Sequence, residues 1–141
     1  MALKDAFVLT YDRMCRYQGE WHTERKLIFP ANVMLESKDE KLLRIELLQH
    51  KNVFNLRQPV LKMTTEEEKL LRFLCGKTRH IEMSRGVIRN GITQVKEGPL
   101  KGMESQICKI DRHKRLAKLC AQEGKNIKYV SVGLEIVKKS I

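Results

Sequence analysis

The chain has 141 residues, of which 42% are hydrophobic and 32% charged. This composition excludes a disordered chain, and the length is sufficient for one ordinary domain or two small ones. No run of about eighteen apolar residues occurs, which excludes a membrane-spanning helix, and we expect no secretory signal because the first residues lack an apolar core. The cysteines, Cys15, Cys75, Cys108 and Cys120, have no CxxC spacing. We therefore expect reduced thiols in a cytoplasmic protein, and no zinc site.

The charge is strongly basic and unevenly distributed. The sequence has 28 Lys and Arg residues against 17 Asp and Glu residues, a net charge of +11. Residues 1–78 carry 14 basic and 11 acidic groups, a net +3, whereas residues 79–141 carry 14 and 6, a net +8. A small protein this basic usually binds a polyanion, most often a nucleic acid. We expect the carboxyl-terminal part to bind it.

The amino-terminal segment has the pattern of strands separated by turns. Ala6–Thr10 is a short apolar run that predicts a buried strand. In the polar and basic stretch 11–26, Gln18-Gly19-Glu20 predicts a turn between two strands. A second apolar strand is predicted around 33–35, with Pro30 at its start or on an edge because proline has no N–H to donate.

Two helices are predicted next. Ser37-Lys38-Asp39-Glu40 has the pattern of a capping box, in which Ser37 and Glu40 satisfy backbone N–H groups reciprocally. A second cap is predicted at Thr65-Glu66-Glu67-Glu68, with Gly76 ending that helix. Between them, Asn52–Leu56 is a candidate short strand. The first helix has a broad apolar stripe that consists of Leu42, Leu43, Ile45, Leu47 and Leu48. The buried side of the second helix is expected to consist of Leu70, Leu71 and Leu74.

The pattern changes after residue 76. Residues 77–90 are mostly polar, with Gly86 and Asn90-Gly91 as breakers, which predicts a linker with little internal structure. From 91 to 141 short strands predominate, and the alternating Val130, Val132, Leu134 and Ile136 predict a half-buried strand. The fold class is therefore α+β, with a small all-β barrel at the carboxyl end.

A glycine-bracketed turn is the sharpest local motif. Gly98, Pro99, Lys101 and Gly102 follow the segment 95–97. Two glycines around a proline allow a tight reversal with positive φ between two strands. From this local chemistry alone, an ordinary hairpin turn remains an alternative to a functional motif.

A basic run is the second motif, and it lies where strands at 103–110 and 115–121 are expected to turn. It consists of Lys109, Arg112, His113, Lys114 and Arg115, with Asp111 suited to the turn itself. A hairpin tip with these side chains can reach phosphates, and a planar guanidinium can stack on an unpaired base. A solvated basic turn without a ligand is the alternative.

Aromatic residues also lie among basic ones near Tyr17 and Trp21. They can serve nucleic acid, or they can belong to a hairpin whose aromatics pack on a neighbouring sheet. The four histidines have no metal-ligand spacing, and no nucleophile, carboxylate pair or phosphate-binding glycine loop is evident. We expect no catalytic site, metal or cofactor.

Taken in order, these segments resemble the NusG family of transcription elongation factors. The KOW motif of that family is similar to residues 95–104, followed by Ile107 and the strand with Val130 and Val132. Its amino-terminal (NGN) domain is similar to residues 19–22, 27–30, 33–37 and 65–68. Residues 109–117 and 133–138 resemble the LoaP branch, whose members are processive antiterminators.

The resemblance implies a two-domain, non-enzymatic factor: an NGN-like domain at 1–76, a linker at 77–90 and a Tudor-like KOW barrel at 91–141. Phe29, Pro30 and Asn32 fall in the region that faces the clamp of RNA polymerase. Lys109, Arg112, His113, Lys114 and Arg115 fall in the hairpin that would contact a nascent RNA hairpin, and Gly98, Pro99, Lys101 and Gly102 in the KOW motif. A ribosomal protein is a further partner in some family members.

Two departures from the family pattern are visible. The strand and long helix that normally precede the segment matching Asp5–Thr10 are absent, so we expect an open sheet edge, exposed apolar surface and a homodimer through the truncated first domain. Ala31-Asn32 also replaces the usual Gly-Tyr after Phe-Pro.

The expected function is transcription antitermination and elongation, by binding RNA polymerase and nascent RNA. One alternative is a KOW-type ribosomal protein that binds structured RNA, which would leave residues 5–75 unexplained. Another is a module that docks a ribosomal protein. A hydrolase is disfavoured because the sequence offers no site for one.

Overall fold

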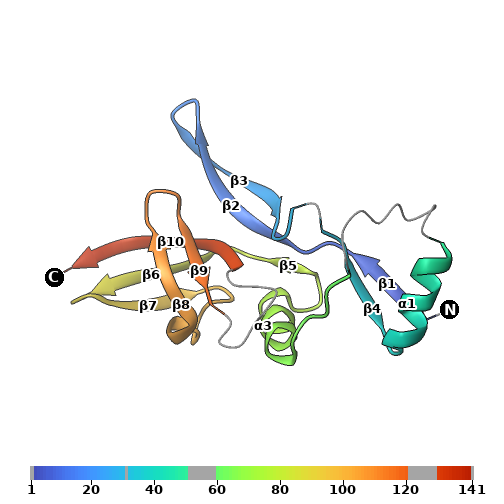
Figure 1. The fold of residues 1–141 in the computed structure, drawn as a ribbon. Coiled ribbons are helices and arrows are strands. Elements are labelled where there is room, and N and C mark those ends of the chain that lie inside the picture. The colour runs from blue at the N-terminus through green and yellow to red at the C-terminus, as the bar shows by residue number, and fades with distance from the viewer. Residues whose placement is uncertain (1, 31, 51–59, 121–129, 141) are drawn as a thin grey trace. The chain divides into compact units, whose positions relative to one another are not determined.

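The computed structural model describes residues 2–30, 32–50, 60–120 and 130–140 (Figure 1). These residues form a mixed α+β protein with two helices and ten strands. The chain divides into two compact units: unit 1 comprises Met1–Val8 and Phe29–Lys62, and unit 2 comprises Leu9–Ile28 and Met63–Ile141. This division differs from the expected domain boundaries because 9–28 belongs with the carboxyl-terminal part. The strand predicted at 52–56 lies outside the described residues.

Unit 1 contains a two-stranded antiparallel sheet and one helix. Strand β1 (Leu3–Phe7) pairs with β4 (Met34–Ser37), which contains most of the strand predicted at 33–35. The buried strand predicted at Ala6–Thr10 is wrong, because the chain leaves one sheet after Phe7 and enters another at Thr10, and Val8 between them is 43% exposed. Helix α1 spans Glu40–Gln49, but its N-cap is Asp39 and not the predicted Ser37. The Ser37 hydroxyl instead donates to the Ala2 carbonyl oxygen at 2.8 Å, because Ser37 is the last residue of β4.

Unit 2 begins with a hairpin whose turn was predicted correctly. Strands β2 (Thr10–Tyr17) and β3 (Glu20–Leu27) pair antiparallel over their full length, and β5 (His80–Ile81) joins β2 in parallel. Gln18 and Gly19 form the turn with φ values of 53° and 76°. We call this hairpin the β2–β3 ribbon.

Helix α3 (Thr65–Cys75) buries Leu70, Leu71 and Leu74 as predicted, and Gly76 ends it with a φ of 58°. Its capping box is one residue earlier than predicted. The Thr64 hydroxyl accepts from the backbone N–H of Glu67 at 3.2 Å, and the Glu67 carboxylate accepts from that of Thr64 at 3.0 Å. This shift directs Glu67 inward, so that only 1% of its surface is exposed.

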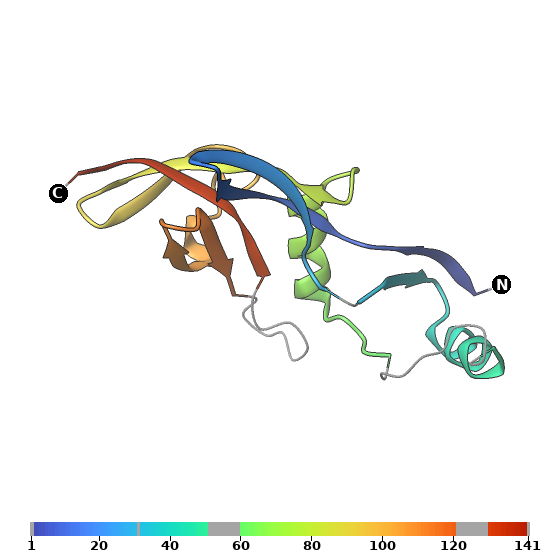
Figure 2. The ribbon, with the colours of Figure 1, turned by 90° about the horizontal axis from the view of Figure 1, so that it is seen from above.

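A five-stranded sheet forms the rest of unit 2. Its strands lie in the order β7-β6-β10-β9-β8. The strands are β6 (Ser84–Arg89), β7 (Ile92–Glu97), β8 (Ile107–Asp111), β9 (Leu116–Leu119) and β10 (Val130–Ser140). β10 changes partner along its length: its first half pairs with β9 and its second half runs parallel to β6 (Figure 2). Among the described strands this sheet does not close, so the predicted small barrel is an open sheet with β7 and β8 at its edges.

The predicted linker at 77–90 is wrong. It contains β5 and β6, and β6 lies inside the five-stranded sheet with Val87 and Ile88 buried. The glycines that suggested a linker serve the strands. Asn90 and Gly91 form the β6–β7 turn, and a Cβ on Gly86 would lie 2.5 Å from the Gln94 carbonyl oxygen, so only glycine allows the close approach of β7.

The core of unit 2 is built from side chains of several strands. Val130, Val132 and Leu134 on β10 are buried, which confirms the predicted alternation, although Ile136 is only half-buried. The largest apolar side chains with no exposed surface are Ile81, Leu100, Leu119 and Leu134. Among the described residues, no helix has the length and apolar character needed to cross a membrane.

Candidate nucleic-acid interface

The basic run forms the turn of the β8–β9 hairpin, as predicted. Arg112, His113 and Lys114 are all exposed in this turn. The Asp111 carboxylate accepts from the backbone N–H of Lys114 at 3.0 Å, and this hydrogen bond holds the pKa of Asp111 below its usual range. The turn therefore presents its basic side chains from a fixed backbone. We call Arg112, His113 and Lys114 the cationic turn.

Lys109 and Arg115 differ from the cationic turn in their surroundings. Lys109 is exposed on β8, opposite Lys118 in the strand register. The Arg115 guanidinium lies 3.8 Å above the centre of the Trp21 ring, and its Nη1 is 3.5 Å from Glu135 Oε1. The Arg115 side chain is only 23% exposed, and its guanidinium group mainly contacts other residues of the protein. Sequence reasoning missed this contact because Trp21 and Arg115 lie far apart in the chain.

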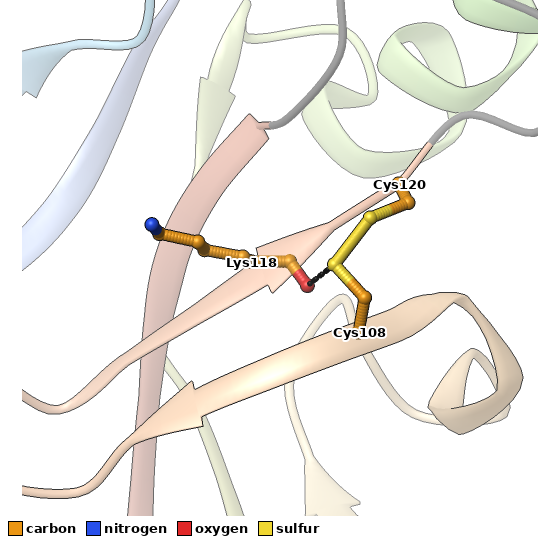
Figure 3. Close-up of a disulfide and its surroundings, with 3 residues drawn as sticks. All are labelled: Cys108, Lys118 and Cys120. Carbon is orange, nitrogen blue, oxygen red and sulfur yellow. Dashed lines mark hydrogen bonds between the residues drawn. A yellow bond between two sulfur atoms is a disulfide. The ribbon is translucent and has the colours of Figure 1, made fainter.

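A disulfide joins Cys108 and Cys120 at the base of this hairpin (Figure 3), which corrects the expectation that all thiols are reduced. The β8–β9 register shifts between Ile107 and Lys109, so Cys108 is an extra residue in the ladder and lies beside Cys120, with a Cα–Cα distance of 6.1 Å. Cys108 Sγ also lies 3.2 Å from the Lys118 carbonyl oxygen (Figure 3).

The turn at 98–102 has the predicted positive φ at both glycines, 99° at Gly98 and 83° at Gly102. A Cβ on Gly98 would lie 2.6 Å from Ser84 Cα, so glycine is required here for space as well as for φ. The backbone N–H of Leu100 donates to the Ser84 hydroxyl at 3.1 Å, and the Leu100 side chain is fully buried. This turn therefore stabilises unit 2, while Lys101 is exposed.

Glu104 follows this turn in the 3-10 helix η1 (Glu104–Gln106). Its Oε1 accepts from the backbone N–H of Val95 at 3.0 Å and of Gly102 at 3.4 Å. Hydrogen bonds from backbone N–H groups, its own first and then that of Val95, hold the pKa of Glu104 below 4.5. The carboxylate thus links β7 to the end of the turn.

The β2–β3 ribbon has two different faces, because directly opposed residues of an antiparallel pair share a face. On one face, Arg16 lies opposite Trp21, and the pairs Met14–Thr23 and Asp12–Arg25 continue along the strands. On the other face the rings of Tyr17 and His22 stack, with centroids 3.9 Å apart and an interplanar angle of 10°. Trp21 thus contacts the neighbouring β8–β9 hairpin through Arg115, in line with the packing alternative.

Phe29, Pro30 and Asn32 form a tight turn in unit 1. The backbone N–H of Asn32 donates to the Phe29 carbonyl oxygen at 3.2 Å, and the Asn32 side-chain amide donates to the Pro30 carbonyl oxygen at 3.1 Å. Pro30 and Asn32 are exposed and Phe29 is half-buried. Asn32 therefore fixes the turn through its own amide.

The part of the chain that the structure describes holds no group of three or more His, Cys, Asp or Glu side chains arranged to bind a metal ion. Neither a scan against models of known protein families nor a search of curated proteins gives a match to this sequence.

Proposed function

We propose that the chain is a non-enzymatic transcription antitermination and elongation factor of the NusG and LoaP type, which acts in the cytoplasm by binding nascent RNA and RNA polymerase. The observation that carries the proposal is the cationic turn: two permanent cations flank His113 on an exposed turn whose backbone is fixed by Asp111. Unit 2, which contains this turn, has 21 basic and 12 acidic residues, a net +9 of the total +11.

The physical basis of RNA binding is phosphate contact. Arg and Lys side chains on a preformed turn release counterions from RNA without the cost of ordering a loop, so the affinity depends strongly on salt. The polymerase contact is assigned to Phe29, Pro30 and Asn32 through the family resemblance, and the KOW role to Gly98, Pro99, Lys101 and Gly102. The open five-stranded sheet would then correspond to the KOW region.

A KOW-type protein that binds structured RNA without polymerase is the second candidate. The observation that favours it is the concentration of charge in unit 2, which suits RNA binding alone. The two functions differ in their need for a protein partner.

The RNA part is tested by fluorescence anisotropy with a labelled RNA stem-loop at two salt concentrations. The variant R112A/K114A should bind about tenfold more weakly, with a shallower salt dependence. The matched control is K138A/K139A, which removes two exposed cations from β10. Equal losses in both variants would contradict a specific role for the cationic turn.

The polymerase part is tested separately by capturing purified bacterial core RNA polymerase with the immobilised full chain. Under the first proposal we expect capture that is reduced by P30A and unaffected by R112A/K114A. RNA binding without polymerase capture would favour the structured-RNA-binding candidate.

A further inference from the structure

Arg115 joins two parts of unit 2 that are distant in sequence. It is the last residue of the β8–β9 turn, directly after the cationic turn, and its guanidinium covers the Trp21 ring on the β2–β3 ribbon. Its Nη1 also contacts Met14 Sδ at 3.4 Å, on the same face of the ribbon as Trp21. This contact places that face next to the β8–β9 turn.

The ribbon is held firmly at its base. His80 Nε2 is 2.7 Å from Asp12 Oδ1, and its Nδ1 is 2.7 Å from the Thr10 hydroxyl. A Cβ on Gly133 of β10 would lie 2.6 Å from the Asp12 carbonyl oxygen, so β10 and β2 approach closely only because this residue is glycine. The ribbon is therefore positioned before any ligand binds.

The face of the ribbon that carries Trp21 also carries two exposed arginines. Arg16 is directly opposite Trp21, and Arg25 lies on the same face further along β3. In the described part of the chain, neither arginine forms an ion pair. Lys26, next to Arg25 but on the opposite face, is instead paired with Glu24 at 3.0 Å. Arg16 and Arg25 are thus the exposed, unpaired cations of the ribbon, and both lie on the face next to the β8–β9 turn, whereas Arg13 on the other face is half-buried.

The chemistry of this face favours phosphate over bases. Its aromatic ring, Trp21, is covered by Arg115, while Tyr17 is on the other face and stacks on His22. Base recognition by stacking needs an accessible ring. Guanidinium groups, by contrast, match the oxygens of a phosphate with paired hydrogen bonds.

We propose that Arg16 and Arg25 form a second phosphate-binding arm, which holds the backbone of the same RNA that the cationic turn contacts. The Trp21–Arg115 contact fixes the two arms relative to each other. This inference rests on the proposed RNA binding and adds a binding site in a segment outside the basic run.

The test is anisotropy with the full chain and a labelled RNA stem-loop across a salt series. The variant R16Q/R25Q should bind about tenfold more weakly, and the slope of log affinity against log salt should fall by about two. The matched control K26Q/K138Q removes the same charge, with Lys26 taken from the opposite face, and should change affinity by less than about threefold. Thermal unfolding checks that all variants keep the fold.

The outcomes separate this inference from the proposed function. If wild type binds, R112A/K114A weakens binding, and R16Q/R25Q binds like wild type or like its control, the second arm is wrong and the proposed function stands. If wild type does not bind RNA, both are wrong.

Trp21 gives a second readout, because it is the single tryptophan of the chain. Phosphate binding should leave its emission nearly unchanged, since Arg115 continues to cover the ring. Strong quenching on RNA addition, lost in R16Q/R25Q, would show a base stacked on Trp21 and would overturn the phosphate-binding assignment.

Discussion

Unit 2 contains most of the buried hydrophobic residues, whereas unit 1 exposes several of its large apolar side chains. Of the eighteen buried hydrophobic residues in the described part of the chain, only Leu43 and Leu47 belong to unit 1. Unit 1 nevertheless exposes several large apolar side chains, and it carries 7 basic and 5 acidic residues, a net +2 against +9 in unit 2. The exposed set in unit 1 is Val8, Val33, Leu42, Ile45, Leu48 and Leu61.

From this difference we expect the two units to bind different kinds of partner. Unit 2 has a core of its own, so its exposed cations are available for an anionic ligand. On helix α1, Leu43 and Leu47 are buried, while Leu42, Ile45 and Leu48 lie on the other side of the helix, because successive residues are rotated by about 100°. An apolar face of this kind suits a protein surface better than RNA.

The largest expected effect comes from the core of unit 2. Leu134→Ala removes a side chain with no exposed surface and should lower the free energy of unfolding by about 3 kcal/mol. The control in unit 1, Leu48→Ala, affects a residue that is 72% exposed and should cost less than about 0.5 kcal/mol. Urea unfolding of both variants measures the difference. Equal costs would mean that the two units do not differ in how they are stabilised.

The second prediction concerns the disulfide, which only unit 2 has among the described residues. Reducing it frees the loop between Cys108 and Cys120 and should lower the free energy of unfolding by about 2–3 kcal/mol. The measurement is urea unfolding with and without a thiol reductant. The control is C108S/C120S, which should not respond to reductant, whereas Cys75 is buried with its pKa raised to about 11 and should react slowly. No response in wild type would restore the expectation of reduced thiols.

Elements encoded by local signals were predictable from the sequence. The β2–β3 turn followed from Gln18-Gly19, the end of α3 from Gly76, and the β8–β9 turn from Asp111 and its polar neighbours, because a positive φ or a turn-capping side chain depends on few residues. The alternation of apolar and polar residues along β10 was also predictable, because it is a local pattern within one strand.

Features that depend on long-range contacts were not predictable. Val87 and Ile88 are consecutive and both buried, so β6 lacks alternation and is recognisable only through its pairing with β10. The disulfide depends on a register shift at Cys108 that no spacing rule gives. The Arg115–Trp21 contact distinguishes Arg115 from the exposed residues of the basic run. It follows from the arrangement of strands in unit 2.

The third prediction concerns self-association through α1, which would give unit 1 a second copy of the chain as partner. Light scattering at tens of micromolar (about the range where weak dimers form) should show a mass above that of the monomer. The variant I45E/L48E should restore the monomer, because each exposed apolar side chain contributes about 1 kcal/mol or more when buried in an interface. The control is I92E in unit 2, where Ile92 is 71% exposed. A monomeric wild type would exclude this dimer.

The smallest expected effect is a change in the pKa of a carboxylate. One carboxylate in each unit has a lowered pKa, and the two are stabilised in different ways. In unit 1, the pKa of Glu40 is lowered first by a hydrogen bond from Lys62 and then by Arg44, with Lys62 Nζ 3.0 Å from Oε2. In unit 2, the pKa of Glu104 is lowered by backbone N–H groups. Since both pKa values are depressed in the folded state, each carboxylate stabilises the fold above its ordinary pKa near 4.5, and this contribution is lost as the pH falls through the lowered value.

High salt should change the pKa values of the two carboxylates by different amounts. At 1 M salt the Debye length is about 3 Å, so the exposed Glu40–Lys62 pair is screened and the pKa of Glu40 should rise toward its ordinary value. Glu104 accepts hydrogen bonds from backbone N–H groups instead of from a charged side chain, and its pKa should stay low. Carbon-detected NMR titration of the side-chain carboxyl groups measures both, with E104Q to assign the signal. If the pKa of Glu104 rises with salt as much as that of Glu40, its depression comes from positively charged groups and not from the backbone N–H groups, because salt screens interactions between charges.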